Sequence, residues 1–406
     1  MKSKWTSIGG TLMLGLFLAY IDRSNLSVTL PGITADLGID SSTASWVLTV
    51  FLIGYAFSNI FGGVFTQKYD PKYVVLTMVA IWSVATILIG FTNSVITLLV
   101  CRLLLGITEG VYWPQQSRFA RDWFSDKELT RANSIIQYYG QFLALGFGFI
   151  ILTPLFEALG WRNVFIITGA IGLLVIVPLY IFVLKKQTEA PFYKPTPVTT
   201  KSKLTWDALG GTSFILLVIT YVTQGMLFWG ITLWIPMVVK SLGYTGMTQA
   251  LLSSLPYVAA VLFAIPMSWL SDKTGKRILI ASLGLLIPGC MLFFMPFVDH
   301  GYAKITLIIL AMGYYASSFT PNIWSIIQSN VKPEAAGSAS GIINGLGAGG
   351  GGTLAGLMVG YLYIKTGSYM YGFMILGSLV IIGGISLLAY GRIKSHPPVT
   401  LATKHI

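Results

Sequence analysis

The chain has 406 residues, of which 54% are hydrophobic and only 10% are charged, whereas a soluble domain usually carries about 25% charged residues. This composition excludes a protein whose main solvent is water. The net charge of +12 does not indicate binding to nucleic acid, because lysine and arginine cluster at the ends of apolar segments instead of forming one basic face.

Apolar segments of about twenty residues follow one another along the chain, each long enough to cross the roughly 30 Å hydrocarbon core of a bilayer as a helix. They lack the polar and apolar alternation of barrel strands, so we expect an all-α integral membrane protein with twelve transmembrane helices. The predicted helices of the first half span residues 6–31, 43–67, 72–91, 94–118, 132–155 and 163–184. Those of the second half span residues 208–239, 247–271, 276–298, 303–329, 336–363 and 369–391.

A polar segment, residues 185–203, separates the two sets of helices. It holds five lysines and three prolines and no apolar periodicity, which is typical of a flexible linker. We therefore expect an N-terminal six-helix bundle (1–184), a cytoplasmic linker (185–203), a C-terminal six-helix bundle (204–392) and a cytoplasmic tail (393–406).

The distribution of basic residues predicts the orientation of the chain. If the N-terminus is cytoplasmic, 20 of the 26 lysines and arginines lie on the cytoplasmic side and four lie on the other. Lysine and arginine are enriched in cytoplasmic loops. Both termini are therefore expected in the cytoplasm, and the membrane is expected to be a bacterial cytoplasmic (inner) membrane.

Two similar loops follow the second helix of each half, Gly63–Lys72 and Ser268–Arg277, which are 205 residues apart. The second loop resembles the G-x-x-x-D-[RK]-x-G-[RK]-[RK] motif of the major facilitator superfamily, which implies that superfamily's fold of two six-helix halves. The first copy departs from the pattern, with Gln67 in the Asp position and Asp70 in the Gly position. The resemblance implies a gating loop formed by Asp272, Lys273, Gly275 and Arg277.

Four charged residues lie well inside predicted helices: Asp22, Arg23, Arg102 and Glu109. Each costs at least about 2.5–3.5 kcal/mol at a helix centre, so such residues usually face a polar cavity and carry function. Arg102 and Glu109 are seven residues apart and therefore lie on one helix face, about 10 Å apart along the axis. A structural alternative is a pair of buried ion bridges that only orient the first and fourth helices.

Asp22 and Glu109 are the only evident proton carriers inside the membrane, because all three histidines lie in loops or in the tail (His300, His396 and His405). Burial and a neighbouring arginine act on a carboxyl group in opposite directions, so either acid can be tuned to titrate as the helices move. Asp22 and Arg23 are adjacent and point about 100° apart, so one can face a cavity while the other faces a neighbouring helix.

A more specific resemblance begins in the first helix. Tyr20–Ser27 resembles the first-helix signature of the anion:cation symporter family, which includes bacterial sugar-acid/proton symporters and animal vesicular glutamate and sialic acid carriers. Arg102–Gly110, followed by Trp113-Pro114, is similar to that family's R-x-x-x-G-x-x-E pattern with a downstream proline. Gly140-Gln141-Phe142 and Gly160-Trp161-Arg162 resemble the sugar-acid branch.

The resemblance implies that Arg23 binds a substrate carboxylate, and that Asp22 and Glu109 couple transport to protons with Arg102 as the ionic partner of Glu109. It also implies hydrogen bonds to the substrate from Tyr20, Tyr55, Gln141 and Asn344. The chemistry agrees, because arginine offers a planar donor fork that matches a carboxylate. For Tyr55 and Gln141, hydrogen bonding between helices is an equal alternative.

Other sequence patterns are less informative about function. Gly345-x-Gly347-x-x-Gly350 has the spacing of a dinucleotide fingerprint, but no strand precedes it, and such glycines inside an apolar helix favour close packing or bending. Three aromatic residues of the tenth helix are secondary candidates for lining a cavity: Tyr314, Tyr315 and Trp324. Cys101 and Cys290 have no metal-ligand spacing, so we expect neither a metal nor a cofactor.

The sequence thus predicts a secondary active transporter that moves a small organic anion with protons by alternating access. The expected substrate is a sugar acid of the hexonate or hexuronate type, and the expected state is a monomer in the lipid bilayer without nucleic acid. The alternative within transport is a major-facilitator efflux carrier for drugs or metabolites. A nutrient sensor without transport is another alternative, whereas an enzyme would need a nucleophile or metal cluster that the sequence does not offer.

The predicted orientation can be tested with two cysteine variants in a background without Cys101 and Cys290. Because Thr199 lies in the linker and Asp299 in a loop on the opposite side, an impermeant thiol reagent should label Asp299→Cys in intact cells. It should label Thr199→Cys only after the membrane is permeabilised. Labelling of Thr199→Cys in intact cells would show that the orientation is inverted.

Overall fold

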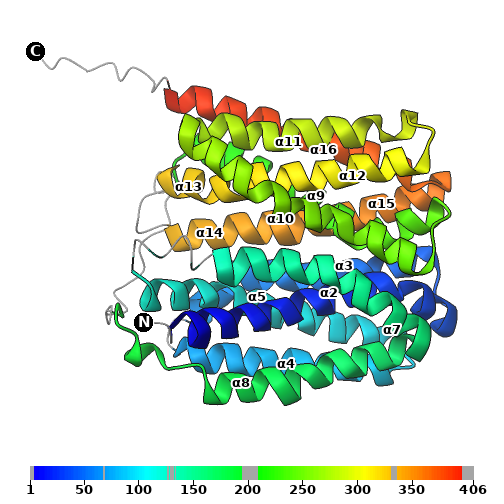
Figure 1. Ribbon diagram of the computed structural model, residues 1–406, viewed down its shortest axis with the longest axis horizontal. Coiled ribbons are helices and arrows are strands. Elements are labelled where there is room, and N and C mark those ends of the chain that lie inside the picture. Colours follow the sequence, from blue (N-terminus) through cyan, green and yellow to red (C-terminus); the bar gives the residue numbers. More distant parts are fainter. Residues whose placement is uncertain are drawn as a thin grey trace, which may run out of the picture.

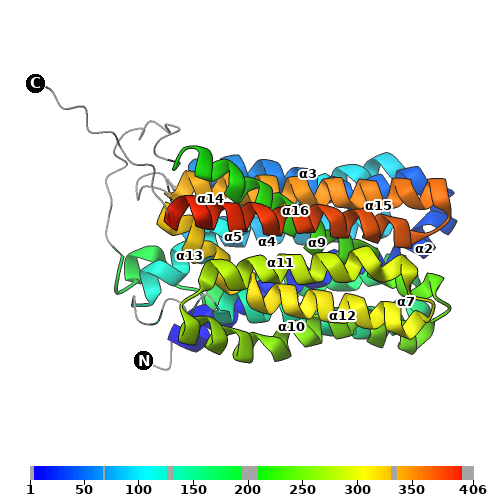
Figure 2. The same cartoon turned by 90° about the horizontal axis from the view of Figure 1, so that it is seen from above.

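The structure is a computed structural model that describes residues 4–66, 69–125, 128, 132, 134–193, 209–330 and 336–395. All regular structure in these ranges is helical, as the apolar segments predict. The helices run along one common axis (Figures 1 and 2). The first described turn of the chain and the end of the last helix lie at the same end of the molecule, the left in both views.

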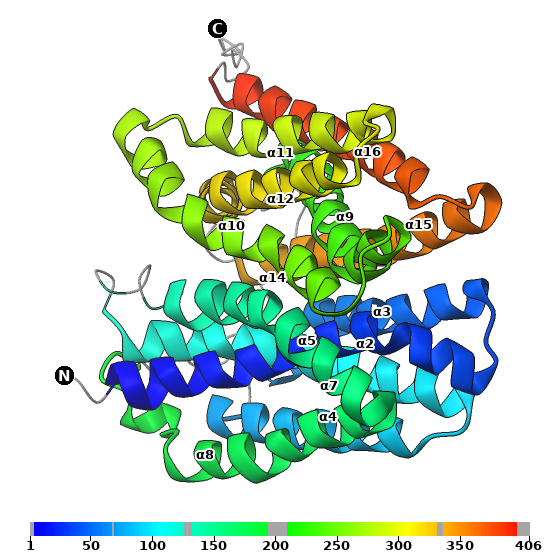
Figure 3. The ribbon, with the colours of Figure 1, turned by 45° about the vertical axis from the view of Figure 1, so that its right-hand side comes forward.

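The first half of the chain forms a helix for each predicted span. These helices are η1 with α2 (Trp5–Gly10 and Thr11–Leu37), α3 (Ser41–Thr66), α4 (Pro71–Phe91), α5 (Val95–Trp123), η2 with α7 (Ser134–Tyr139 and Gly140–Ile171), and η3 with α8 (Gly172–Ile176 and Val177–Phe182). The fifth and sixth predicted spans meet inside α7 without a loop, because Gly160 reverses the chain with a φ of 78° and a ψ of 164°. Figure 3 shows the chain returning along itself between the start of α7 and α8.

The second half follows the same pattern with one interruption. Its helices are α9 (Thr212–Ser241), α10 (Gly246–Thr274), α11 (Arg277–Phe294), α12 (Gly301–Ser318), α13 (Thr320–Asn330), α14 (Ala336–Asn344), η7 (Gly345–Gly351), α15 (Gly352–Thr366) and α16 (Tyr369–Ser395). The tenth predicted span, 303–329, is broken at Phe319 between α12 and α13.

Ten helices of the described chain are long and apolar enough to cross a membrane. One of them, Gly140–Phe182, contains the two predicted spans that meet at Gly160, and α12 with α13 covers one more. The arrangement is therefore consistent with twelve crossings. Figure 3 also shows α2–α8 grouped on one side and α9–α16 on the other.

The two groups of helices pack closely where α3 meets α14, η7 and α15. Glycines allow this approach, because a Cβ atom on Gly341 would lie 2.9 Å from the carbonyl oxygen of Asn59, and one on Gly349 would lie 2.7 Å from the backbone nitrogen of Ala56. The glycine-rich segment thus serves helix packing, as the sequence indicates. On the other side of the interface, the Tyr138 hydroxyl of η2 donates to the Ala260 carbonyl of α10 over 2.9 Å.

The start of α2 is held against the segment that follows α5. The Lys4 ammonium donates to the Glu128 carboxylate over 2.7 Å, and the ring of Trp5 lies 4.6 Å from that of Phe124 between centres. The hydrogen bond from Lys4 lowers the pKa of Glu128 to about 2, so the pair stays ionised until the pH falls towards that value. These contacts fix α2 relative to α5 at this end of the molecule.

A glycine also sets the distance between α3 and α5. A Cβ atom on Gly106 would lie far inside van der Waals contact with the carbonyl oxygen of Phe51, so the two backbones touch at this level. Gly106 is the glycine of the R-x-x-x-G-x-x-E pattern, between Arg102 and Glu109. Its lack of a side chain therefore lets this part of α5 lie directly against α3, where the Arg102 guanidinium packs over the Phe51 ring.

Gly106→Ala should destabilise the protein, because a methyl group forced between two packed backbones typically costs about 1–3 kcal/mol. The midpoint of thermal unfolding of the purified protein measures this effect. Gly146→Ala is the matched control, since its added methyl group would lie 3.8 Å from the nearest side-chain atom of Val258. Equal midpoints for the two variants would contradict the contact between α3 and α5.

Candidate functional site

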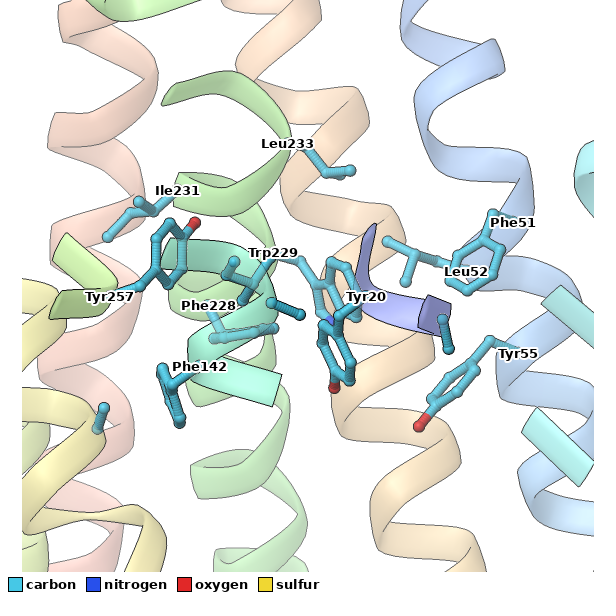
Figure 4. Close-up of a cluster of buried hydrophobic side chains, with 14 of the residues drawn as sticks. Tyr20, Phe51, Leu52, Tyr55, Phe142, Phe228, Trp229, Ile231, Leu233 and Tyr257 are labelled. Carbon is cyan, nitrogen blue, oxygen red and sulfur yellow. The ribbon is translucent and has the colours of Figure 1, made fainter. Parts of the chain in front are cut away.

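The centre of the candidate site is Arg23, which lies midway along α2 and is 3% exposed. Its guanidinium carbon lies over four aromatic rings, at 4.1 Å from the ring centre of Tyr20, 5.2 Å from Phe51, 5.1 Å from Tyr55 and 5.4 Å from Trp229. Aromatic ring faces attract cations. Because Trp229 belongs to α9 and the other rings to α2 and α3 (Figure 4), the guanidinium lies where the two groups of helices meet.

Arg23 forms a buried ion pair with Glu109 of α5. The Arg23 Nε atom lies 2.7 Å from Glu109 Oε2, and both side chains are at most 3% exposed. The expected partner, Arg102, acts on Glu109 only at longer range, and its guanidinium lies over the Phe51 ring at 5.0 Å. This corrects the sequence-based pairing. Seven residues of helix separate Arg102 from Glu109 by about 10 Å along the axis, whereas Arg23 reaches Glu109 from the facing helix.

Each member of this ion pair keeps unused hydrogen-bonding capacity. Arg23 Nη1 and Glu109 Oε1 are buried and have no hydrogen-bond partner within the described chain. An unpaired buried donor or acceptor costs about 1–3 kcal/mol, and such groups call for a functional or structural explanation. A guanidinium group that uses only some of its N–H donors can bind a second anionic partner.

Asp22 is the second buried carboxyl group, 1% exposed. Neither of its oxygens has a hydrogen-bond partner within the described residues. The Thr168 side chain lies beside it, but the Thr168 hydroxyl donates to the Phe165 carbonyl over 3.3 Å. Burying an ionised carboxylate without a close partner is costly, and protonation removes that cost.

The remaining predicted ligands occupy three different settings. Tyr20 and Tyr55 cover Arg23 with their rings, and Figure 4 shows their hydroxyl groups pointing to the same side. Gln141 lies at the start of α7, half-buried, and no hydrogen bond joins it to a described residue. Asn344 lies at the end of α14, where its amide donates to Asn59 Oδ1 over 2.7 Å. The structure therefore brings the two tyrosines to Arg23 but places Asn344 in a separate set of contacts.

Several residues of the site escaped the sequence reasoning. Trp229 and Phe51 contact Arg23 through their rings, which apolar patterning cannot distinguish from ordinary packing. Gln224 of α9 accepts a hydrogen bond from the Tyr315 hydroxyl of α12, and both side chains are buried. A lone glutamine inside an apolar helix was a usable signal for Gln224. Of the secondary aromatic candidates, Tyr315 is the one that joins this pair.

The two gating-loop copies differ in structure as they do in sequence. In the second copy, Gly275 ends α10 with a φ of 64°, a conformation that favours glycine, and Arg277 begins α11. The side chain of Asp272 lies outside the described residues, as does Gln67 of the first copy. In that first copy, Asp70 accepts from the backbone N–H of Lys72 over 2.9 Å and caps α4.

Asp70 also ties the first loop to the segment after α8. Its Oδ2 atom accepts from the backbone N–H of Gln187 over 3.0 Å, and the Gln187 side chain donates to Asp122 at the end of α5 over 2.5 Å. The residue that replaces the motif's glycine thus has a structural function of its own, since it links α4, α5 and the chain beyond α8.

The Gly160-Trp161-Arg162 triplet has a structural role at the opposite end. Gly160 reverses the chain, and the next two side chains both donate to Asp36 at the end of α2, Trp161 over 3.1 Å. Arg162 also donates to the Thr92 carbonyl over 3.1 Å. The triplet therefore joins the end of α2 to the connection between α4 and α5.

Comparison with known proteins identifies the family of the chain. The family model described as Major Facilitator Superfamily matches residues 12–355. The chain belongs to this superfamily. It is therefore a multi-pass membrane transporter and not an enzyme.

Three similar proteins span nearly the whole chain. A probable sulfoacetate transporter of Cupriavidus necator is 30% identical and covers 93% of this chain and 92% of its own. The D-galactonate transporter of Escherichia coli is 26% identical over 94% of this chain and 95% of its own. The crystal structure of a bacterial homologue of the human lysosomal transporter Spinster, inward-facing and occupied, has a TM-score of 0.73 at 17% identity and covers 97% of this chain and 98% of its own. That likeness shows the shared fold.

The pairing of Glu109 with Arg23 can be tested by thermal unfolding of Arg23→Met, Arg102→Met, Glu109→Gln and their combinations. Removing either Arg23 or Glu109 should lower the unfolding midpoint, because the remaining charge is left buried without a partner. The double variant Arg23→Met/Glu109→Gln should lose much less than the sum, by a coupling of about 0.5–3 kcal/mol. Arg102→Met with Glu109→Gln should be closer to additive. A larger coupling to Arg102 would contradict the ion pair.

Proposed function

We propose that the protein is a proton-coupled symporter of a small organic anion of the sugar-acid type, located in a bacterial cytoplasmic membrane with both termini in the cytoplasm. Two six-helix halves, residues 1–184 and 204–392, would alternate access to a site between them. The observation that carries the proposal is the buried pair of Arg23 and Glu109 at this interface, with an unused donor and an unused acceptor.

Arg23 is the proposed anchor for the substrate carboxylate. Its planar fork can bind a carboxylate through two parallel hydrogen bonds, and the surrounding rings hold the guanidinium at the interface. The superfamily membership and the two organic-acid transporters among the relatives support an anionic substrate. Those relatives are named for a dianion, sulfoacetate, and for a singly charged hydroxy acid, D-galactonate.

Coupling to protons follows from competition for Arg23. The ionised Glu109 carboxylate occupies Arg23, so a substrate carboxylate must displace it. Protonation of Glu109 removes its charge and frees the guanidinium for the substrate. The proton and the anion therefore bind in concert, and the site exchanges one buried ion pair for another.

Asp22 is the proposed second proton carrier, with Arg102 as its neighbouring cation. If both acids cycle, two protons accompany a singly charged anion, and one net positive charge crosses the membrane. The membrane potential then contributes about 2.3 kcal/mol per 100 mV, whereas one proton per anion is electrically silent.

The proposal predicts that Glu109→Gln and Asp22→Asn abolish accumulation of D-galactonate driven by a pH gradient in proteoliposomes. Counterflow, which needs no net proton movement, should survive in at least one of them. Glu157→Gln is a matched control, because this acid lies on α7 and is exposed. Continued pH-driven accumulation by both variants would show that the two carboxyl groups are structural. Absence of uptake and of counterflow by the wild-type protein for every organic anion tested would favour a sensor over a carrier.

A further inference from the structure

A hydrogen bond between two asparagine side chains joins the two groups of helices. The Asn344 amide at the end of α14 donates to Asn59 Oδ1 of α3 over 2.7 Å. Asn59 also donates to the carbonyl of Tyr55, four residues earlier on its own helix, over 2.8 Å, and the Tyr221 hydroxyl of α9 lies 3.5 Å from Asn344 Oδ1. Both asparagines are buried. The donor of Asn344 and the acceptor of Asn59 therefore satisfy each other across the interface.

This bond lies between Arg23 and one end of the molecule. α3 runs from Ser41 to Thr66, and Tyr55, whose ring covers Arg23 at 5.1 Å, comes four residues before Asn59. Four residues of helix advance about 6 Å, toward the end of the molecule that we propose is cytoplasmic. α14 lies at that end, together with the end of α16 (Figure 1). Separation of α14 from α3 would therefore open the interface on the cytoplasmic side of Arg23.

Polar contacts between the halves are shorter on this side of Arg23 than on the other. On this side, the Tyr138 hydroxyl of η2 also donates to the Ala260 carbonyl of α10 over 2.9 Å. On the far side, the Ser27 hydroxyl of α2 lies 3.5 Å from the Thr232 carbonyl of α9, which is longer than most O–H···O hydrogen bonds. Among these contacts, the directional bonds thus hold the proposed cytoplasmic side closed.

A segment that can bend follows Asn344 directly. η7 (Gly345–Gly351) is a π-helix in which five of the seven residues are glycine. Helices bend at π-helical turns and at glycines. Beyond η7, α15 is fixed to α9, because the Trp234 indole donates to the Gly356 carbonyl over 3.2 Å. α14 can therefore change direction while α15 keeps its place.

We infer that the hydrogen bond between Asn59 and Asn344 is a latch that holds α14 against α3, and that α14 swings away about η7 when the latch opens. This inference goes beyond the proposed function, since it holds for any transported solute. In the closed arrangement the two amides satisfy each other, whereas in the open arrangement water satisfies both.

The latch has a specific energetic signature. Removal of one amide leaves its partner buried and unpaired in the closed arrangement only, and an unpaired buried group is costly. Each single substitution should therefore favour the open arrangement. Replacement of both asparagines by apolar residues of similar size leaves no unpaired amide, so the double variant should regain much of the closed arrangement.

Distances between two spin labels measure this equilibrium in the purified full chain in lipid nanodiscs. The labels are attached through Tyr73→Cys and Lys276→Cys, at exposed positions near the proposed cytoplasmic ends of the two halves, in a background without the native cysteines. Asn59→Leu and Asn344→Leu should each raise the ratio of long to short distances by at least about fivefold. The double variant should raise it less than either single variant.

Asn163→Leu is the matched control. The Asn163 amide donates to the carbonyl of Leu159, four residues earlier on α7, over 2.7 Å, as Asn59 does to Tyr55. Within the described residues it makes no hydrogen bond to the second half, so this variant should leave the ratio unchanged. The latch is wrong if both single variants of the pair unfold at the wild-type temperature and keep the wild-type distances. A double variant that opens as far as the two single effects combined would also overturn it.

Gly350→Ala tests the bending at η7. A Cβ atom on Gly350 would lie 3.9 Å from the nearest atom, the carbonyl oxygen of Gly345, so the methyl group fits the closed arrangement. Alanine favours a continuous helix over a bent one by about fivefold relative to glycine, so this variant should lower the ratio of long to short distances. An unchanged ratio, with the expected response of the asparagine variants, would show that the halves separate without bending at η7.

Discussion

The contact on which this structure depends is the ion pair between Arg23 and Glu109, buried in the low-dielectric interior of a membrane protein. Removing water from two charges costs several kcal/mol per ion, which the pair recovers only with good geometry and further favourable contacts. Here the rings around Arg23 add attraction. Two of these rings, Phe51 and Tyr55, belong to α3, which Gly106 allows to pack closely against α5.

The four charged side chains inside the membrane differ in whether they have hydrogen-bond or ion-pair partners, and this difference is relevant to the mechanism. Arg23 and Glu109 are in contact, whereas Asp22 and the Nε atom of Arg102 have no hydrogen-bond partner in the described chain. Partly satisfied polar networks are costly in a low dielectric. On the proposed function, a proton or anion that enters this network would relieve one member and redistribute the contacts of the others. That property would suit a site whose occupancy changes how the two groups of helices pack.

The helices and the four charged residues inside them could be predicted from the sequence. Hydropathy and the free-energy cost of burying a charge in a membrane can both be judged from the local sequence. The sequence could not predict the partner of Glu109, since helical periodicity relates residues on one helix and Arg23 approaches from another. The reversal at Gly160 depends on a single residue's backbone conformation, so two helices meet there without a polar loop. The sequence also could not predict the contact of Asn344 with Asn59 of α3, because that pairing depends on the packing of η7 and α14 on α3.

Under the proposed function, the two halves have different roles because their buried polar groups differ in chemistry. The charges lie on α2 and α5 in the first half, and neutral phenol and amide groups dominate the second. Charge determines how protons and a carboxylate exchange at Arg23, because electrostatic interactions are strong in a low dielectric. Neutral hydrogen bonds are weaker individually and depend more on geometry. Within the described residues, the exchange at Arg23 and Glu109 therefore depends on charges that α2 and α5 supply.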